Sequence, residues 1–264
     1  MLVAMTALLI DLDGVIYEGD KPVAGAAETV AWIGQERIPH LFLTNTTSRP
    51  RAALVEKLAD MNVSVTADQI LTPPLAAVQW ISEHAPGPAA LFVAPATRGE
   101  FSGLDIAPEG HSDAASVVVG DYGERWNFAE LNRAFRLLMA RPQPKLVALG
   151  MTRYWKAADG LRLDTAPFVM ALSYATGAEP VVLGKPAKPF FETALTMLDV
   201  GAEQAVMVGD DIKGDIGGAR AAGITAVLVK TGKFRPDDLD GDVEPDLVLD
   251  SIADLPDCWD AIRV

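Results

Sequence analysis

The sequence has few cysteines, few histidines and no long apolar run. It contains one cysteine, Cys258, and three histidines among 264 residues. A single cysteine excludes an internal disulfide and a multi-cysteine zinc site, so nothing favours an oxidising, secreted setting. A membrane-spanning helix needs about 20 apolar residues, and no uninterrupted stretch approaches that length. The apolar residues 1–10 lack a basic flank and a cleavage site, so we interpret them as leading into a buried first strand. We therefore expect a cytoplasmic protein with no membrane partner.

Basic residues are scarce relative to acidic ones. The chain carries 22 Lys plus Arg against 36 Asp plus Glu, which gives a formal net charge of −14. Such a surface repels nucleic-acid backbones and anionic lipid headgroups, so we expect no nucleic-acid partner. Half of the residues are hydrophobic, an ordinary proportion for a globular chain.

Short apolar runs alternate with helical patterns towards both ends of the chain. Continuous apolar runs of strand length suit a parallel sheet that is covered by helices on both faces. The alternation predicts a Rossmann-like, doubly wound α/β core, in which ligands bind beyond the carboxyl ends of the strands. The predicted strands are residues 7–12, 39–43, 69–72 (the weakest), 205–208 and 225–229, and the predicted helices are residues 26–35, 51–61, 74–84, 188–198 and 213–222.

The middle of the chain is predicted to be a second α/β unit inserted into this core. A turn-rich break at residues 85–90 precedes new strand candidates at 91–94, 116–120 and 145–149 and helix candidates at 127–140 and 166–176. The expected division is a core of residues 1–79 and 182–264 and an inserted domain of residues 80–181.

Acidic residues gather at two predicted strand ends. Asp11 and Asp13 follow the first strand, and Asp210, Asp211 and Asp215 follow the run at 205–208. Turn formation and helix capping account for some of these acids but not for all five. If both strand ends share one edge, charges about 4 Å apart repel by roughly 4 kcal/mol at an effective dielectric near 20. An all-oxygen donor set without histidine or cysteine predicts Mg²⁺ rather than zinc.

Polar groups of the opposite character occur at the same kind of position. Thr44 and Asn45 end the second predicted strand, and Lys185 opens a helix. A hydroxyl, an amide, an ammonium and a metal ion together can bind the oxygens of a phosphoryl group.

These four motifs, in their order along the chain (Asp11 to Asp13, Thr44 and Asn45, Lys185, Asp210 to Asp215), resemble those of the haloacid dehalogenase-like phosphatases. Residues 217–224 and 229–236 resemble subfamily IIA, and the position of the insert matches the α/β cap called type C2. The resemblance implies that Asp11 is the nucleophile that forms an aspartyl-phosphate and that Asp13 is the general acid and base. It implies that Mg²⁺ is held by Asp11, the backbone carbonyl of Asp13 and Asp210, while Asp211 and Asp215 assist. Thr44, Asn45 and Lys185 would bind the phosphate.

The resemblance also assigns roles outside these motifs. Residues 14–25 would form a small hairpin flap, and the cap would determine substrate specificity. In the cap, Arg153, Tyr154, Trp155 and Lys156 combine cations with aromatic rings, which suits an anionic or ring-containing leaving group; packing of the aromatic rings in the cap core is the equal alternative. A homodimer through the cap is a further arrangement that the resemblance implies.

The leading hypothesis is a Mg²⁺-dependent phosphatase of a small phosphorylated metabolite. A phosphomutase or pyrophosphatase would use the same core. A phosphoacceptor signalling module also forms an aspartyl-phosphate, but such modules are about half this length and lack an acid two residues after the phosphorylated aspartate. The complete motif set disfavours a non-catalytic homologue.

Overall fold

The apolar runs predicted as strands at the two ends of the chain pair with one another in one parallel sheet. The structure, a computed structural model, describes residues 6–157 and 159–263, so residues 1–5 of the apolar start lie outside it. The order of the six strands is β14-β13-β12-β1-β4-β5, and every pair is parallel, which confirms the predicted fold class. The strands are β1 (Ala7–Asp11), β4 (His40–Leu43), β5 (Ile70–Leu71), β12 (Ala205–Gly209), β13 (Thr225–Val229) and β14 (Leu247–Leu249).

The strand order reverses direction at the centre of this sheet. The chain runs from β1 outward to β4 and β5, and later from β12 outward to β13 and β14. The register places Ile10 of β1 between Phe42 of β4 and Val208 of β12. The carboxyl ends of β1 and β12 therefore lie side by side, at the point where doubly wound sheets bind ligands.

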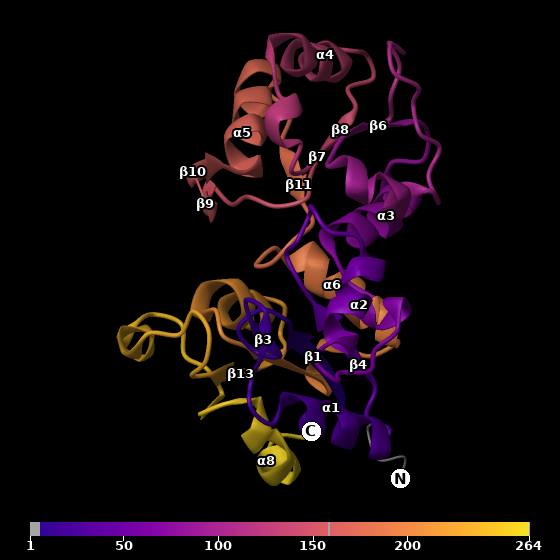
Figure 1. The fold of residues 1–264 in the computed structure, drawn as a ribbon. Coiled ribbons are helices and arrows are strands. Elements are labelled where there is room, and N and C mark those ends of the chain that lie inside the picture. Colours follow the sequence, from indigo (N-terminus) through magenta and orange to yellow (C-terminus); the bar gives the residue numbers. More distant parts are fainter. Residues whose placement is uncertain (1–5, 158, 264) are drawn as a thin grey trace. The chain divides into compact units, whose positions relative to one another are not determined.

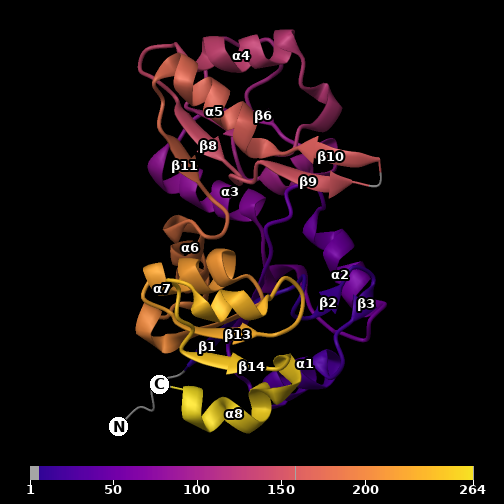
Figure 2. The ribbon, with the colours of Figure 1, turned by 90° about the vertical axis from the view of Figure 1, so that its left-hand side faces the viewer.

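Helices cover both faces of the sheet (Figure 2). On one face, apolar side chains of α1 (Ala26–Gln35), α2 (Arg51–Ala59) and α8 (Leu255–Ile262) pack against Leu8 and Ile10 in one buried cluster. On the other face lie α6 (Lys188–Leu198), which contacts β4, and α7 (Gly218–Ala221), which contacts β13. A short antiparallel hairpin of β2 (Tyr17–Glu18) and β3 (Lys21–Pro22) occupies the region predicted to form the flap.

The middle of the chain forms a second, smaller parallel sheet with the order β11-β8-β7-β6 (Figure 1). Its strands are β6 (Ala89–Phe92), β7 (Ser116–Val119), β8 (Lys145–Ala148) and β11 (Pro180–Val182), and its helices are α3 (Pro73–His84), α4 (Phe128–Leu138) and α5 (Thr165–Thr176). A separate antiparallel hairpin joins β9 (Tyr154–Ala157) to β10 (Gly160–Leu163).

The contacts divide the chain into two units. Unit 1 contains Met1–Thr44, Arg51–Leu71 and Lys185–Val264, and unit 2 contains Asn45–Pro50 and Thr72–Gly184. The boundary expected at residue 79/80 falls inside α3, whereas the contacts place the division before that helix. Thr72 caps α3 by accepting from the Leu75 N–H, and the contacts group the whole of α3 with unit 2. None of the described helices combines the length and apolarity that crossing a bilayer requires.

The helix expected at residues 213–222 differs from the prediction. A π-helical segment (Ile212–Gly217) comes first, and only Gly218–Ala221 is α-helical. Glycine weakens a helix interior, and here Gly214, Gly217 and Gly218 fall within the range expected to be one α-helix. At Gly218 a Cβ would overlap Phe191 and Pro186, so the glycine permits close packing of α7 on α6.

Candidate functional site

Asp11 is the last residue of strand β1 and therefore lies at the carboxyl edge of the large sheet. All five residues of β1 are buried, as expected for a central parallel strand, and Asp11 itself is 4% exposed. Its Oδ1 accepts a hydrogen bond from the Leu12 N–H at 2.8 Å. Asp13 lies two residues beyond the strand and is exposed, so the two acids of this motif have different surroundings.

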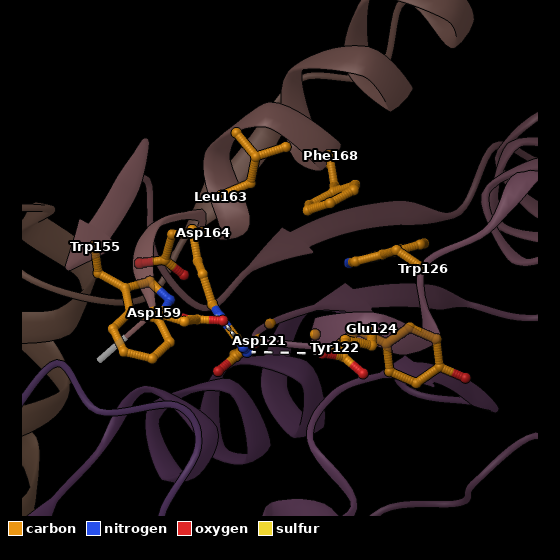
Figure 3. Close-up of a pocket in the computed structure, with 12 residues that line it drawn as sticks. Asp121, Tyr122, Glu124, Trp126, Trp155, Asp159, Leu163, Asp164 and Phe168 are labelled. Atoms are coloured by element: carbon orange, nitrogen blue, oxygen red, sulfur yellow. Dashed lines mark hydrogen bonds and ion pairs between the residues drawn. The ribbon is translucent and has the colours of Figure 1, made fainter. Parts of the chain in front are cut away.

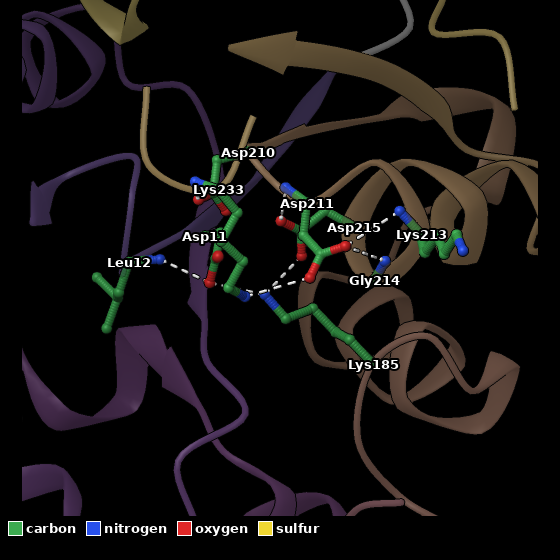
Figure 4. A network of polar contacts seen from close by, with 9 residues as sticks. All are labelled: Asp11, Leu12, Lys185, Asp210, Asp211, Lys213, Gly214, Asp215 and Lys233. Carbon is green, nitrogen blue, oxygen red and sulfur yellow. Dashed lines mark hydrogen bonds and ion pairs between the residues drawn. The ribbon is translucent and has the colours of Figure 1, made fainter. Parts of the chain in front are cut away.

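The neighbouring strand β12 and the π-helical segment that follows it bring two more buried acids to the same place. Asp210 and Asp215 are each 1% exposed. Carboxylate oxygens of Asp11, Asp210 and Asp215 all lie within 4.8 Å of one another (Figure 4). The predicted convergence of acids from the two strand ends therefore occurs for these three.

Lys185 pairs with two of the three acids in this cluster. Its Nζ is 2.6 Å from Oδ1 of Asp11 and 2.7 Å from Oδ1 of Asp215, and its side chain is 4% exposed. The lysine that sequence reasoning placed at a helix start thus bridges the two acidic motifs inside unit 1 (Figure 4).

The cluster is short of positive charge. Burial, with repulsion from Asp215, raises the pKa of Asp11 to about 8, and Lys185 offsets only part of that rise. Burial also raises the pKa of Asp210 to about 6. Burial opposes the charge on Lys185, but its carboxylate partners outweigh this effect and raise the pKa of the ammonium. Three buried carboxylates, of which only Asp11 and Asp215 pair with the ammonium, therefore require a further cation or protons.

Asp211 forms different contacts from Asp210 and Asp215. Its Oδ1 accepts from the N–H groups of Lys213 (3.1 Å) and Gly214 (2.8 Å), which caps the π-helical segment. Its own N–H donates to Oδ2 of Asp215 at 3.2 Å. Burial opposes its charge, but these bonds and Lys233 outweigh burial and hold the pKa of Asp211 below its usual value. Asp211 thus supports the site by orienting Asp215.

Sequence reasoning missed the loop after β13. Lys233 donates its N–H to Oδ2 of Asp210 at 2.7 Å, and its Nζ lies 3.2 Å from Oδ2 of Asp211. The Thr231 hydroxyl donates to the Gly14 carbonyl, and the Gly232 N–H donates to Glu18 of the flap hairpin at 2.7 Å. The signal in the sequence is a hydroxyl, a glycine and a lysine directly after a buried strand, the same position that identified the other motifs.

Two glycines make room for the Asp210 side chain. Gly14 and Gly232 both have positive φ, at +93° and +61°. A Cβ at either position would overlap the Asp210 carboxylate, so larger residues are excluded by space as well as by backbone conformation.

The acidic cluster fits a hard metal ion. Among the described residues, Oδ1 of Asp210 is buried and has no hydrogen-bond partner. A buried carboxylate oxygen without a partner is costly, and converging carboxylate oxygens are the donors that hard divalent cations take. The carboxylate cluster contains Asp215, which the sequence analysis expected only to assist metal binding. The Asp13 side chain is not part of this cluster; the sequence analysis expected Asp13 to bind the metal through its backbone carbonyl.

The remaining predicted residues lie in both units. Thr44 is buried after β4 in unit 1, and its N–H donates to the Leu71 carbonyl at 3.2 Å. Asn45 is exposed and is grouped with unit 2 by its contacts. The four cap residues, Arg153 to Lys156, are exposed and begin the hairpin of unit 2. The structure therefore brings together Asp11, Asp210, Asp211, Asp215 and Lys185 within unit 1.

Comparison with known proteins identifies the family. The model described as haloacid dehalogenase-like hydrolase matches residues 8–106, and one described as HAD-hydrolase-like matches residues 182–255. The chain is 38% identical to the human protein named phospholysine phosphohistidine inorganic pyrophosphate phosphatase, over 97% of this chain and 94% of that one. The chain belongs to the haloacid dehalogenase-like hydrolases.

Other members of the family share the sequence or the fold over most of their length. A bovine haloacid dehalogenase-like hydrolase domain-containing protein 2 is 38% identical over 90% of this chain and 88% of its own. The solved structure of p-nitrophenyl phosphatase from Archaeoglobus fulgidus superposes with a TM-score of 0.85 at 28% identity, covering 96% of this chain and 99% of that one. The predicted resemblance is therefore confirmed across both units.

Proposed function

We propose that this protein is a Mg²⁺-dependent phosphatase that hydrolyses a small phosphorylated metabolite through an aspartyl-phosphate on Asp11. The observation that carries the proposal is the buried cluster of Asp11, Asp210 and Asp215, in which Lys185 pairs with Asp11 and Asp215. Relatives of similar length are phosphatases by name, which agrees with this chemistry. Unit 1 would be the catalytic core, and unit 2 would be the cap.

The geometry of Asp11 suits nucleophilic attack. The Leu12 N–H and the Lys185 ammonium both hold Oδ1, which leaves Oδ2 as the attacking oxygen. Attack forms the bond from Oδ2 to phosphorus and breaks the bond from phosphorus to the leaving oxygen. Asp13 would give its proton to that oxygen. It would then take a proton from the water that attacks phosphorus, which releases phosphate and restores Asp11.

The other residues would hold charge. Asp11, Asp210 and the backbone carbonyl of Asp13 would hold the metal ion, with Asp215 beside them. When bound, Mg²⁺ supplies positive charge that offsets the charge of the phosphoryl oxygens. Thr44, Asn45 and Lys185 would bind those oxygens as well.

Hydrolysis of p-nitrophenyl phosphate tests the proposal. The wild type should turn over repeatedly with Mg²⁺ and stop in EDTA, and Asp11→Asn should lose turnover while keeping its circular dichroism spectrum. Asp257→Asn, which changes an exposed acid of α8, is the matched control and should keep wild-type rates. Wild-type turnover by Asp11→Asn would refute the assignment of the nucleophile.

The products separate the alternatives on the same core. A phosphoacceptor module would keep the phosphoryl group on the protein after one turnover, and a phosphomutase would return it to an organic acceptor. A substrate panel of sugar phosphates, nucleotides, pyridoxal phosphate, phosphoglycolate and pyrophosphate should then define specificity. The name of the human relative adds phospholysine and phosphohistidine to that panel.

A further inference from the structure

Asp13, the proposed general acid and base, lacks the side-chain contacts that hold the clustered acids. Within the described part of the chain, no hydrogen bond or ion pair holds its carboxylate. The residue is exposed and lines a pocket of about 230 Å³ in unit 1 together with Glu18 and Asp210. A general acid must lie within hydrogen-bond reach of the oxygen that it protonates. The position of the Asp13 side chain therefore depends on its backbone.

The backbone on both sides of Asp13 is bonded to one residue, Tyr17. The Tyr17 N–H donates to the Leu12 carbonyl at 3.2 Å, and the Gly14 N–H donates to the Tyr17 carbonyl at 2.7 Å. Leu12 and Gly14 are the two chain neighbours of Asp13. The Ile16 N–H gives the Leu12 carbonyl a further donor at 2.9 Å. A shift of Tyr17 would therefore move the backbone that carries Asp13.

Lys57 of α2 contacts Tyr17 and the rest of the flap hairpin. Its Nζ lies 3.9 Å from the centroid of the Tyr17 ring and donates to the Gly19 carbonyl at 2.6 Å. The Lys57 side chain is only 17% exposed and the Tyr17 ring is buried, so the contact between them is shielded from water. Oδ1 of Asp20 lies 3.6 Å from the same Nζ, but Asp20 is almost fully exposed, so this ion pair adds little. The ring and the carbonyl are therefore the main partners of Lys57.

A ring that is held by an ammonium differs from a ring that is held by other rings. In unit 2, the Trp126 ring is stacked on Phe168 at a centroid distance of 4.8 Å (Figure 3) and on Phe92 at 5.4 Å. Packing of this kind tolerates the exchange of one apolar side chain for another of similar volume. The attraction between Lys57 and the Tyr17 ring depends on a charge, and it is stronger because the ammonium is partly desolvated. Removal of that one charge should therefore loosen Tyr17.

The hairpin is also bonded to the loop after β13. Glu18 accepts from the Gly232 N–H at 2.7 Å, and the neighbouring Lys233 N–H donates to Asp210. Those contacts join the hairpin to a metal-binding acid. None of the contacts of Lys57 among the described residues involves the acid cluster. A change at Lys57 should therefore reach Asp13 without altering the metal site.

We propose that Lys57 is a positioning residue for general acid catalysis, because its ammonium holds the Tyr17 ring and Tyr17 holds the backbone on both sides of Asp13. The inference rests on the proposed function, since it takes Asp13 as the acid that protonates the leaving oxygen. Lys57 acts only through the position of Asp13. Its loss should therefore slow most those substrates whose leaving group depends on that proton.

Two aryl phosphates with different leaving groups test the proposal in the full-length protein with Mg²⁺. Phenolate is a poorer leaving group than p-nitrophenolate, so its departure depends more on protonation. Lys57→Met should lower kcat/KM for phenyl phosphate by about tenfold or more, and for p-nitrophenyl phosphate by less than about threefold. Lys57→Arg returns a cation to the ring and should recover most of the loss. Lys188→Met, which alters an exposed lysine of α6, is the matched control and should change neither rate. Equal losses for both esters in Lys57→Met would overturn the proposal.

Asp13→Asn separates this inference from the proposed function. It should show the same selective loss of phenyl phosphate hydrolysis, more strongly, and the addition of Lys57→Met should then cause no further selective loss. If Asp13→Asn slows both esters equally, the assignment of the acid fails and the role of Lys57 fails with it. If Asp13→Asn is selective and Lys57→Met is not, the acid stands and only the role of Lys57 is refuted.

Amide hydrogen exchange in EDTA tests the link from Lys57 to the Asp13 backbone without turnover. The Gly14 amide, which donates to the Tyr17 carbonyl, should exchange at least about fivefold faster in Lys57→Met than in the wild type. The amide of Phe42, which is buried in β4, should exchange at the wild-type rate, and calorimetry should give the wild-type affinity for Mg²⁺. An unchanged Gly14 exchange rate would overturn the proposal. A loss of Mg²⁺ affinity in Lys57→Met would also overturn it, because the effect would then lie at the metal site.

Discussion

Replacing Lys185 with methionine tests whether one ammonium holds the buried acids together. The change keeps an unbranched side chain of similar length and removes the charge that lies 2.6 Å from Asp11 and 2.7 Å from Asp215. Lys188→Met is the matched control. It alters a lysine three residues away whose side chain is 59% exposed and pairs with Glu192 at 3.3 Å.

The expected cost follows from the distance between the acids. Carboxylate oxygens of Asp11 and Asp215 lie no more than 4.8 Å apart. At an effective dielectric near 20, two unit charges at that distance repel by about 3.5 kcal/mol when both acids are ionised. Because the pKa of Asp11 is about 8, proton uptake by Asp11 limits this repulsion at pH 7. Loss of one partner of a buried ion pair costs about 3–5 kcal/mol, which agrees with this figure. We expect Lys185→Met to lower the free energy of unfolding of unit 1 by about 3–5 kcal/mol in EDTA at pH 7, and Lys188→Met by less than about 0.5 kcal/mol.

Urea unfolding followed by the indole N–H signals of Trp32 and Trp259 measures this cost. Both tryptophans belong to unit 1, where their rings meet edge to face at 6.1 Å. Adding Asp215→Asn to Lys185→Met removes one of the repelling charges and should recover much of the loss. The reasoning is refuted if the two lysine variants unfold at the same urea concentration, or if the double variant is no more stable than Lys185→Met.

The remaining predictions concern the metal site and the hairpin of unit 2. Gly232→Ala pushes a Cβ against Asp210 and should weaken Mg²⁺ binding about tenfold or more by calorimetry, while Gly34→Ala, whose Cβ would meet open space, should leave it unchanged. Thr231→Val removes the hydroxyl that donates to the Gly14 carbonyl and should weaken Mg²⁺ binding in the same assay, with little change in the fold. Trp155→Ala should change the relative rates across a panel of phosphate esters, and an unchanged profile would count against a role in specificity.

The helices and strands that could be predicted from the sequence are those whose apolar residues follow a clear helical pattern or form a continuous apolar run. Helices α1 and α6 begin and end where the pattern places them, and the strands β1, β12 and β13 are continuous buried runs. Strands β11 and β14 contain three residues each, too few to show a period. The β9–β10 hairpin is exposed along nearly its whole length, so the side chains of its two strands do not report burial on one face.

In the candidate site, too, some residues could be predicted from the sequence and others could not. Acids at the ends of two buried strands could be assigned to one edge of a sheet, because parallel strands share their carboxyl ends. The role of the Thr231–Lys233 loop in the site could not be predicted from the sequence, because the loop contacts the site through backbone N–H groups as much as through side chains. Asp211 shows the limit of counting acids: four residues from Asp215, it uses one oxygen to cap a helix rather than to join the cluster.

The orientation of the buried acids depends on the backbone around them. Each of the three clustered carboxylates has one oxygen held by a main-chain N–H group, supplied by Leu12 for Asp11, by Lys233 for Asp210 and by Asp211 for Asp215. An oxygen held in this way cannot rotate out of the cluster without losing a buried hydrogen bond. Because the N–H groups come from three separate loops, the acids are preorganised only when the whole carboxyl edge of the sheet has folded. An isolated motif therefore carries the ligands of the site but not their geometry.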